Sequence, residues 1–323
     1  MDNKTSEYVA IIGGTNIDIQ GFPKKKLILQ DSNIGNVKIS LGGVGRNIAE
    51  NLARLGVNTN LISIIGDDVY GNMVLDYSKE IGLNMDNTLV LEGEKTSVYL
   101  SILNEIGDME IAISSMDIYE KMDIEFIEKR RKIIESSSLC IIDTNVPKDT
   151  IEYILTNYKG VDFFLDTVST FKTERVKDLI GCFHTIKPNK LEVEILTGIK
   201  INNNDDLKKA AEHLHRRGVK RVFITLGDKG VFYSDGISMG HKNTPKVNIV
   251  NATGAGDAFV AALAYGYINN IEIEEVVDIA MYASIVALSH EDTINPKMSI
   301  EEIYLKMKEN ENARKIFRDK SRS

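Results

Sequence analysis

The sequence predicts an α/β protein with a doubly wound, mostly parallel sheet, helices on both faces and a small group of strands outside it. Between about residues 139 and 233, short apolar segments alternate with helical segments, which is typical of parallel strands joined by helices. Two other stretches, about 19–41 and 88–113, contain β-rich segments without helices between them. We expect these strands to form a small separate layer.

Composition favours one large domain over residues 1–323 and argues against several other classes. The chain is 43% hydrophobic and 27% charged, as globular proteins are. Its net charge is −8 with scattered Lys and Arg, so no surface for a nucleic-acid polymer is expected. The first residues are polar and no apolar run approaches about 18 residues, which predicts a cytoplasmic protein without a membrane partner. Cys140 and Cys182 lie beside apolar residues and are expected to be buried free thiols.

The first predicted strand, Tyr8–Ile12, is apolar and is followed by Gly13 and Gly14. Asn16 and Asp18 come directly after it. Because ligands of open α/β sheets bind at the carboxyl ends of strands, both side chains are candidates for substrate contacts. Asn and Asp also favour turns through local hydrogen bonds, and that alternative stays open.

A second glycine-rich segment, Leu41–Asn47, precedes a predicted helix. Apolar residues recur at helical spacing from Val44 to Leu55, and Gly56 is placed to end the helix. A Gly-Gly pair directly before a helix is a place where a small ligand can touch the backbone.

The elements that follow are predicted from the same patterns. Asn60–Ile65 is expected to be one strand, and Asp67 or Asp68 to cap a helix that runs to Ile81. Residues 96–102 alternate like a strand with one polar face. Later strands are predicted at 139–142, 161–165, 184–186, 221–226 and 231–233, and later helices at 205–217, 258–265 and 282–289. The charged tail from Glu309 is expected to fray.

The segment Asn251–Asp257 joins a predicted strand, Lys246–Val250, to a helix that is apolar on every side. Its glycines allow close approach of a ligand, and the first N–H groups of the helix have no intrahelical acceptor, so the segment is a potential anion site. Asp257 places a carboxylate at the mouth of that site. It is either a general base that takes a proton from an attacking hydroxyl or a residue that stabilises the first helical turn.

Two motifs, A-T-G-A-G-D at 252–257 and G-G-x-G-x-N-x-A at 42–49, resemble the signatures of the PfkB (ribokinase-like) family of carbohydrate kinases. The resemblance implies a ribokinase-like fold whose extra strands form a lid over the substrate. It also implies that Asp257 is the catalytic base and that Gly254, Ala255 and Gly256 supply the amides of an anion hole. The residues that would bind substrate hydroxyls are Asn16, Asp18, Gly42, Gly43 and Asn47.

A third motif points to the nucleotide. Asn189-Lys190-Leu191-Glu192 resembles the family's N-x-x-E motif, which organises Mg²⁺ and phosphate through water. The same spacing suits a helix capping box, and both readings can hold together. By the same resemblance, the residues expected at the ATP site are Lys187, Asn189, Thr225, Gly227, Gly230 and Ser284.

Within the family, the chain is most similar to the pseudouridine kinases over nearly its whole length. This implies transfer of a phosphoryl group from ATP to the 5′-hydroxyl of pseudouridine. The alternatives are a kinase for another sugar or nucleoside (ribose, fructose or adenosine) and a silent ligand sensor, against which the intact Asp257 argues. A sugar-phosphate substrate would need a cation such as Arg46. The residues expected near the base are Thr96, Ser97, Tyr99 and Asn145.

Two accessory properties follow from the resemblance. Many members have Asp where this chain has Asn251, near a site for a monovalent cation, so activation by K⁺ is an open and doubtful expectation. Exposed lid strands can pair between subunits, so a homodimer through the lid is a second expectation.

Overall fold

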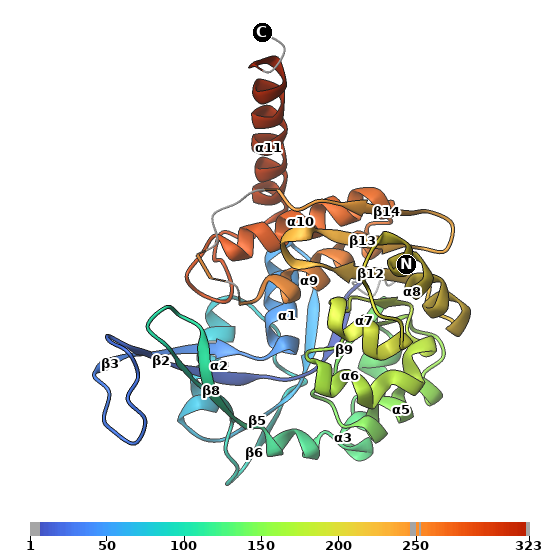
Figure 1. Ribbon diagram of the computed structural model, residues 1–323. Helices are drawn as coiled ribbons and strands as arrows, with labels where there is room; N and C mark the ends of the chain where they lie inside the picture. The colour runs from blue at the N-terminus through green and yellow to red at the C-terminus, as the bar shows by residue number, and fades with distance from the viewer. Residues whose placement is uncertain (1–6, 246–249, 252, 321–323) are drawn as a thin grey trace.

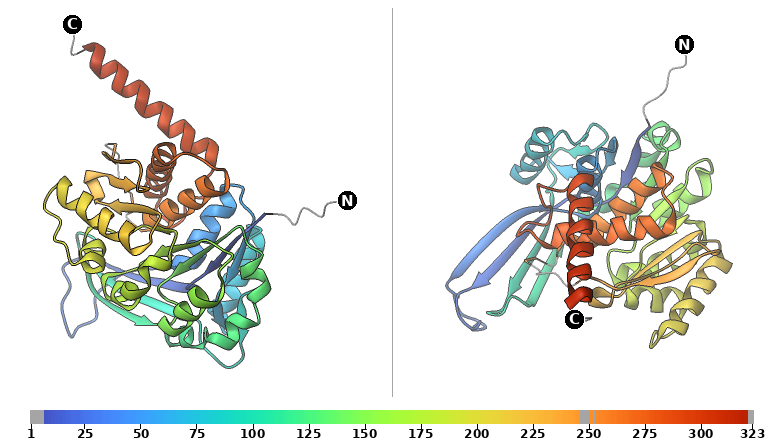
Figure 2. Two further views of the ribbon diagram at one scale, coloured as in Figure 1. Left: turned by 90° about the vertical axis from the view of Figure 1, so that its right-hand side faces the viewer. Right: turned by 90° about the horizontal axis from the view of Figure 1, so that it is seen from above.

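The computed structural model describes residues 7–245, 250, 251 and 253–320, and an eight-stranded sheet forms its centre (Figures 1 and 2). From edge to edge its strands are β14 (Met239–Lys242), β13 (Val231–Ser234), β12 (Arg221–Thr225), β11 (Thr185–Ile186), β10 (Phe163–Asp166), β9 (Leu139–Asp143), β1 (Val9–Ile12) and β4 (Thr59–Ile62). The strands from β12 to β4 are parallel, whereas β13 pairs antiparallel with both of its neighbours, β12 and β14. The predicted α/β class is confirmed.

Helices cover both faces of this sheet because neighbouring side chains of a buried strand point to opposite faces. Ile11 of β1 belongs to one core and Ile12 to the other. The helices that contribute to the core of Ile11 are α1 (Val44–Arg54), α9 (Ala255–Ile268), α10 (Ile273–Leu288) and α11 (Ile300–Lys320). Those that contribute to the core of Ile12 are α3 (Ile124–Glu128), α4 (Arg131–Glu135), α5 (Lys148–Asn157), α6 (Thr170–Val176), α7 (Lys190–Thr197) and α8 (Asn204–Arg217), with the 3₁₀ helices η1 (Asp117–Lys121) and η2 (Lys177–Cys182).

A second sheet of four strands projects from one side of this body (Figures 1 and 2). We call it the outer sheet, and its strands in order are β3 (Gly35–Gly42), β2 (Asn16–Pro23), β7 (Ser97–Leu103) and β8 (Met109–Ser115). Paired residues share a face, so the register separates two surfaces. The polar face includes Asp18, which pairs with Ser40 and Tyr99, and the apolar face includes Ile19, which pairs with Ile39 and Leu100.

The segment predicted as one strand at Asn60–Ile65 is divided in two. β4 ends at Ile62, and the chain then leaves the main sheet as β5 (Ile64–Gly66). Ser63 lies at the break, where its hydroxyl donates to the Gly13 carbonyl at 2.7 Å. β5 pairs with β6 (Leu89–Leu91), so β6 belongs to a two-stranded sheet and not to the outer sheet. The helix α2 (Val69–Glu80) follows β5 and is capped by Asp68, which is one of the two residues predicted as its cap.

The helix expected at 282–289 is confirmed, but it begins earlier, because α10 starts at Ile273. Two other expectations, on the charged tail and on Cys182, differ from the structure. The charged tail is helical: α11 extends to Lys320 and projects from the body (Figure 1). Cys182 is exposed, since it ends η2 at the surface, while Cys140 is buried in β9 as expected.

The strand predicted at Lys246–Val250 lies mostly outside the described residues, as do the first six residues. No helix in the described part of the chain is both long and apolar enough to cross a membrane.

Candidate active site

The amino end of α9 lies at the carboxyl side of the parallel strands, and glycine makes its geometry possible. Gly254 is the N-cap residue and has a left-handed backbone, with φ of +81°. A Cβ at Gly254 would come within 2.2 Å of the Thr293 carbonyl oxygen, so no other residue fits there without movement. The backbone N–H groups of the first helical turn have no intrahelical acceptor and point out of the helix. This end of α9 therefore presents donors and the positive end of a dipole to an anion.

The carboxyl group of Asp257 lies half-buried in the first turn of α9. Its Oδ2 accepts a hydrogen bond of 2.8 Å from Asn47 Nδ2, which comes from α1. Burial first, and then the charge of Asp166, raises the pKa of Asp257 to about 8, against the lowering effects of Asn47 and Lys187. A carboxylate with a raised pKa beside a set of anion donors is suited to accept a proton from a bound hydroxyl.

Two buried aspartates act on Asp257 through their charge: Asp143 at the carboxyl end of β9 and Asp166 at the carboxyl end of β10. Asp143 accepts hydrogen bonds from the Gly14 N–H at 2.8 Å and the Asn145 N–H at 2.7 Å. Burial raises the pKa of Asp143 to about 6, although these two bonds favour its charged form. Asp143 thus fixes the turn that follows β1.

A compact glycine floor joins the two predicted substrate motifs. A Cβ at Gly43, whose φ is +97°, would come within 2.4 Å of the Gly14 carbonyl oxygen. A Cβ at Gly45 would come within 2.7 Å of Gly13 Cα. The backbones of the two segments can pack this closely only without side chains between them. The Gly-Gly pairs therefore bring the start of α1 against the start of β2.

The predicted hydroxyl-binding residues come together on this floor. Asn16 Nδ2 donates to Asp18 Oδ1 at 2.6 Å, and a Cβ at Gly42 would come within 2.4 Å of Asp18 Oδ2. Burial raises the pKa of Asp18, while Asn16 and Arg46 oppose that shift. Asn47 connects this group to Asp257 through the hydrogen bond described above.

The ammonium group of Lys187 lies on the other side of the helix start. Its Nζ is 3.4 Å from Asp166 Oδ2, and a Cβ at Gly256 would come within 3.1 Å of it. Burial opposes its charge, but the carboxylates of Asp166, Glu192 and Asp257 raise the pKa of Lys187 above its ordinary value. A fixed positive charge therefore stands next to the anion donors of α9.

Asn189 and Glu192 form the capping box that their spacing allows. Asn189 Oδ1 accepts from the Glu192 N–H at 3.0 Å, and Glu192 Oε2 accepts from the Asn189 N–H at 2.8 Å. Thr167 Oγ1 also donates to Glu192 Oε2 at 2.7 Å. Within the described residues, no three His, Cys, Asp or Glu side chains gather as a metal site. A Mg²⁺ ion here would therefore take most of its ligands from phosphate and water.

A pocket of about 880 Å³ opens beside α9 and α10, between them and the strands β12 and β13. Its apolar side chains come from Val231, Phe259, Met281, Ile285 and Leu288. It also contains all but one of the residues predicted for ATP, namely Asn189, Thr225, Gly227, Gly230 and Ser284. Such a volume with an apolar wall and a few polar groups suits a nucleotide base and ribose.

Of the residues expected near the nucleoside base, Thr96 has its hydroxyl bonded to other protein groups. Its Oγ1 donates to Asp68 Oδ1 at 2.6 Å and accepts from the Gly66 N–H at 3.1 Å. Ser97 and Tyr99 lie on the polar face of the outer sheet, paired with Asn16 and Asp18. The hydroxyl of Tyr99 donates to Met109 Sδ at 3.3 Å, toward the next strand.

Asn145 follows β9 and lies near the floor, because a Cβ at Gly14 would come within 2.8 Å of its Nδ2. Its Oδ1 accepts a hydrogen bond from Lys172 Nζ of α6. Burial lowers the pKa of Lys172, although the Asp143 charge opposes that shift. Lys172, Asp143 and Asp166 are members of the site that the sequence motifs did not predict. The signal for both aspartates was their place at the carboxyl ends of predicted strands.

Arg46 does not contact the open part of the site. It is 1% exposed, and its guanidinium donates to Glu50, to Asn47 and to two carbonyl groups of β3. The guanidinium of Arg46 is therefore not available to bind a sugar phosphate.

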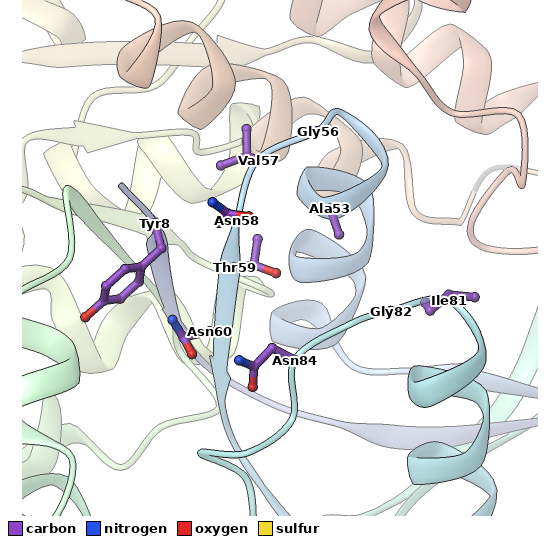
Figure 3. Close-up of a pocket in the computed structure, with 10 residues that line it drawn as sticks. All are labelled: Tyr8, Ala53, Gly56, Val57, Asn58, Thr59, Asn60, Ile81, Gly82 and Asn84. Carbon is purple, nitrogen blue, oxygen red and sulfur yellow. The ribbon is translucent and has the colours of Figure 1, made fainter. Parts of the chain in front are cut away.

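A second hollow, of about 630 Å³, lies at the opposite end of the main sheet, around the amino ends of β1 and β4 (Figure 3). The residues that line it are Tyr8, Ala53, Gly56, Val57, Asn58, Thr59, Asn60, Ile81, Gly82 and Asn84. No Asp, Glu, Lys, Arg or His is among these ten residues, and Tyr8 is the one titratable side chain in that lining.

The comparison with known families agrees with this site. The model of the family described as "pfkB family carbohydrate kinase" matches residues 6–300. The chain belongs to the pfkB family of carbohydrate kinases. It is accordingly a phosphotransferase with an alcohol group as acceptor.

Individual pfkB relatives cover almost the whole chain. The pseudouridine kinase of Escherichia coli (strain K12) is 39% identical over 298 residues, which are 92% of this chain and 95% of that protein. A guanosine-inosine kinase of Exiguobacterium acetylicum is 28% identical and covers 90% of this chain and 97% of its own length.

Solved structures show the same architecture. A crystal structure from Clostridium perfringens has a TM-score of 0.85 at 44% identity and covers 95% of this chain and 97% of that one. The ribokinase of Arabidopsis thaliana, complexed with ribose and ATP, has a TM-score of 0.82 at 21% identity and covers 93% and 98%. The ribokinase-like fold is confirmed.

Proposed function

We propose that this pfkB kinase transfers a phosphoryl group from ATP to the 5′-hydroxyl of pseudouridine, giving pseudouridine 5′-phosphate. The observation that carries the proposal is the half-buried Asp257 carboxyl group, with its raised pKa, beside the start of α9, where Gly254 leaves the backbone N–H groups open. The choice of substrate is supported by the 39% identity with a pseudouridine kinase over nearly the full length of both chains.

In this proposal the acceptor nucleoside lies on the glycine floor. Asn16, Asp18 and Asn47 bind its ribose hydroxyls, and Gly42 and Gly43 allow the sugar to approach the backbone. The 5′-hydroxyl then lies against Asp257, which takes its proton as the oxygen attacks the γ-phosphorus, while the bond from that phosphorus to the β–γ bridging oxygen breaks and ADP leaves. The amides of Gly254, Ala255 and Gly256 donate to the transferring group, and they need no rearrangement to do so.

ATP occupies the 880 Å³ pocket in this proposal. Its base lies on the apolar wall of Phe259, Met281 and Ile285, and its phosphates pass Gly227 toward α9. Lys187 supplies a fixed positive charge at that end. When bound, Mg²⁺ neutralises phosphate charge, and Asn189 and Glu192 position it through water.

The outer sheet acts as the lid, because its polar face carries Asp18 and Tyr99 beside the acceptor position. Closure of this sheet excludes water, which would otherwise accept the phosphoryl group. Recognition of the base falls to Ser97, Tyr99 and Asn145, with Lys172 as an added partner of Asn145. We do not assign the base to Thr96, whose hydroxyl and N–H are both bonded to Asp68.

The test is kcat/KM for pseudouridine, uridine and ribose at saturating Mg·ATP. Pseudouridine and uridine have the same shape, but pseudouridine has an additional N–H donor on its base. A buried acceptor for that donor favours pseudouridine, by up to about 10⁴-fold where a polar group is otherwise left unpaired. Ribose should react least well, because it lacks the base contacts. Equal values for the two nucleosides, or a higher value for ribose or fructose, would refute the substrate and leave the kinase activity standing.

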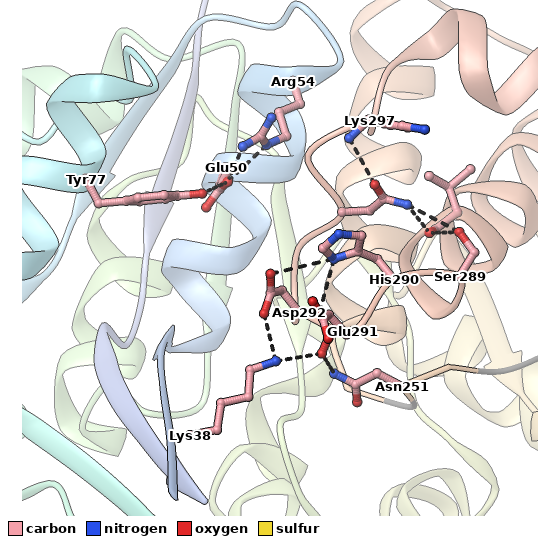
Figure 4. A network of polar contacts seen from close by, with 12 residues as sticks. Lys38, Glu50, Arg54, Tyr77, Asn251, Ser289, His290, Glu291, Asp292 and Lys297 are labelled. Carbon is pink, nitrogen blue, oxygen red and sulfur yellow. Dashed lines mark hydrogen bonds and ion pairs between the residues drawn. The ribbon is translucent and has the colours of Figure 1, made fainter.

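The chain needs no added potassium in this proposal. The Glu291 carbonyl, near Asn251, already accepts hydrogen bonds from Asn251 Nδ2 and Lys38 Nζ, both at 2.9 Å (Figure 4). Lys38 Nζ also lies 2.7 Å from Asp292 Oδ1, and Asn251 adds no negative charge for a cation. Equal rates in potassium-free and potassium-containing buffers are expected, and a marked activation by potassium would contradict this.

The protein also forms a homodimer through the apolar face of the outer sheet. Exposed apolar side chains on that face are Val37, Ile39, Ile111 and Ile113. A second copy of the same face would remove them from water, which is the main driving force for such association.

A further inference from the structure

Arg46 occupies an unusual position for a charged residue, since its whole side chain is buried within α1 and the end of β3. It is 1% exposed, and its partner Glu50 is 0% exposed. Arg46 Nη1 donates to Glu50 Oε2 at 2.7 Å, and Nε donates to the Gly42 carbonyl at 3.1 Å. Buried charges are retained at a cost in desolvation, so a fully bonded arginine next to the site calls for a role.

The third guanidinium nitrogen of Arg46, Nη2, is linked to Asp257 through Asn47. Arg46 Nη2 donates to Asn47 Oδ1 at 2.7 Å, and Asn47 Nδ2 donates to Asp257 Oδ2 at 2.8 Å. A guanidinium has donors only, so it can hydrogen-bond to the oxygen of the Asn47 amide but not to its NH₂ group. With its oxygen held in this way, the amide presents its N–H to Asp257.

The opposite orientation of Asn47 would be unfavourable for catalysis. An amide turned by 180° would place Oδ1 against the Asp257 carboxylate, where two acceptors repel. The Asn47 hydrogen bond is one of the groups that hold the pKa of Asp257 down, with Lys187, while burial, Asp166 and Asp143 raise it. Loss of the correct orientation therefore keeps the base protonated to a higher pH.

We propose that Arg46 is a positioning residue, which fixes the orientation of the Asn47 amide and through it holds Asp257 ready to accept a proton. Arg46 touches neither substrate nor ATP in this role. Glu50 keeps the guanidinium in place by accepting from it at the side away from Asn47. The inference rests on the proposed role of Asp257 as the base.

Arg54 supplies a matched control, because it lies on the same helix and binds the same carboxylate. Its Nε and Nη2 donate to Glu50 Oε1 at 2.9 and 2.8 Å, beside the hydroxyl of Tyr77 (Figure 4). Its third nitrogen donates to the Pro296 carbonyl and not to Asn47. Replacement of Arg54 therefore disturbs Glu50 without releasing Asn47.

The experiment compares Arg46→Lys with Arg54→Lys in the full-length protein, by the pH dependence of kcat/KM. A lysine at position 46 can pair with Glu50 but cannot also hold Asn47 with a second planar donor. We expect the acidic limb of the Arg46→Lys profile to move up by about half to one pH unit, with a loss of about 3–10-fold at neutral pH. The Arg54→Lys profile should keep its midpoint. An unmoved limb in Arg46→Lys, or equal movement in both variants, would overturn the proposal.

Two further variants keep the test decisive. If Arg46→Lys does not fold, the double variant Arg46→Met with Glu50→Gln removes both buried charges, and it should show the same upward shift. The Asp257→Asn variant shows whether the acidic limb of the kcat/KM profile arises from Asp257. If the limb and the rate persist in that variant, the base assignment itself fails. If the limb disappears there but stays unmoved in the Arg46 variants, only the positioning role fails.

Discussion

The burial of one carboxyl group governs the pH dependence expected of this kinase. Burial and the Asp166 charge raise the pKa of Asp257 to about 8, so the group is largely protonated at neutral pH in the free protein. A protonated carboxyl group cannot accept the proton of the hydroxyl. We therefore expect kcat/KM to rise with pH up to about 8.

Replacement of the base tests that assignment. Asp257→Asn should lower kcat by roughly 10²–10⁴-fold, which is the usual contribution of general-base catalysis, and should remove the acidic limb. The control is a circular dichroism spectrum that shows an unchanged fold. A folded variant with the kcat of the natural protein would rule out the role.

The same residue should lower stability as the pH rises. The pKa of Asp257 goes from 3.8 in the unfolded chain to about 8 in the folded protein, so the folded state binds an additional proton between these values. The free energy of unfolding falls with pH wherever the folded state binds more protons. Stability from this group is therefore complete below about pH 4 and is lost as the pH rises toward about 8.

Asp257→Asn should consequently have a higher Tm than the natural protein at pH 8, and the difference should shrink toward pH 4. The measurement is thermal denaturation of both proteins across this range. Because other groups such as Asp143 titrate in both, the difference between the two curves isolates Asp257. A difference in Tm that does not change with pH would contradict the buried, raised pKa.

At the scale of an element, the start of α9 depends on one backbone conformation. Gly254→Ala adds a Cβ at φ of +81° and within 2.2 Å of the Thr293 carbonyl oxygen. Strain of this kind costs about 1–3 kcal/mol, and relief of the contact would displace the anion donors. We expect lower stability together with a large loss of kcat, measured by denaturation and by steady-state kinetics.

Gly82→Ala is the matched control for this variant. Gly82 also has a left-handed backbone, with φ of +71°, but a Cβ there meets nothing within 4 Å. It should lose about 1–2 kcal/mol of stability and keep its activity. If Gly254→Ala behaved like Gly82→Ala, the close contact at α9 would have no part in catalysis.

The capping box of α7 has a structural and a catalytic consequence that can be separated. Asn189→Ala with Glu192→Ala should raise the Mg²⁺ concentration needed for half-maximal activity more than it raises KM for the nucleoside. Asn203 caps α8 by accepting from the Asp205 and Asp206 N–H groups, so Asn203→Ala removes a comparable cap, worth about 1 kcal/mol. Only the first variant should change the Mg²⁺ dependence. If both merely lower Tm, Asn189 and Glu192 are no more than a cap.

The sequence predicted these elements where a local pattern decides the structure. The buried helix after Gly254 and a cap at either Asp67 or Asp68 follow from composition and capping chemistry alone, and the structure selects Asp68. The break at Ser63 could not be predicted in this way, because the apolar run continues through it and a distant carbonyl, that of Gly13, receives its hydroxyl. The orientation of Arg46 could not be predicted either: its partners Gly42 and Glu50 are near in sequence, but a motif does not show that the guanidinium turns toward them and away from the open part of the site.

At the scale of the whole molecule, the outer sheet is polar where it faces the body and apolar where it faces outward. Lys38 on β3 illustrates the inner side, since it bonds to Glu291 and Asp292 in the segment after α10 (Figure 4). On the outer side, Val37 is 70% and Ile113 is 60% exposed. A lid with this asymmetry can be covered on its outer face without blocking its inner one.

Dimerisation through that outer face makes a definite prediction. Ile39→Lys places a charge on the apolar face, where pairing with a second copy would bury it, so the variant should be monomeric. Ile237→Lys is the control, because Ile237 is 95% exposed but lies in the turn between β13 and β14. Light scattering after size-exclusion chromatography should give twice the chain mass of 36.0 kDa for the natural protein and for Ile237→Lys, and the single mass for Ile39→Lys. A natural protein that is monomeric at micromolar concentration, or an Ile39→Lys variant that stays dimeric, would exclude this face as the interface.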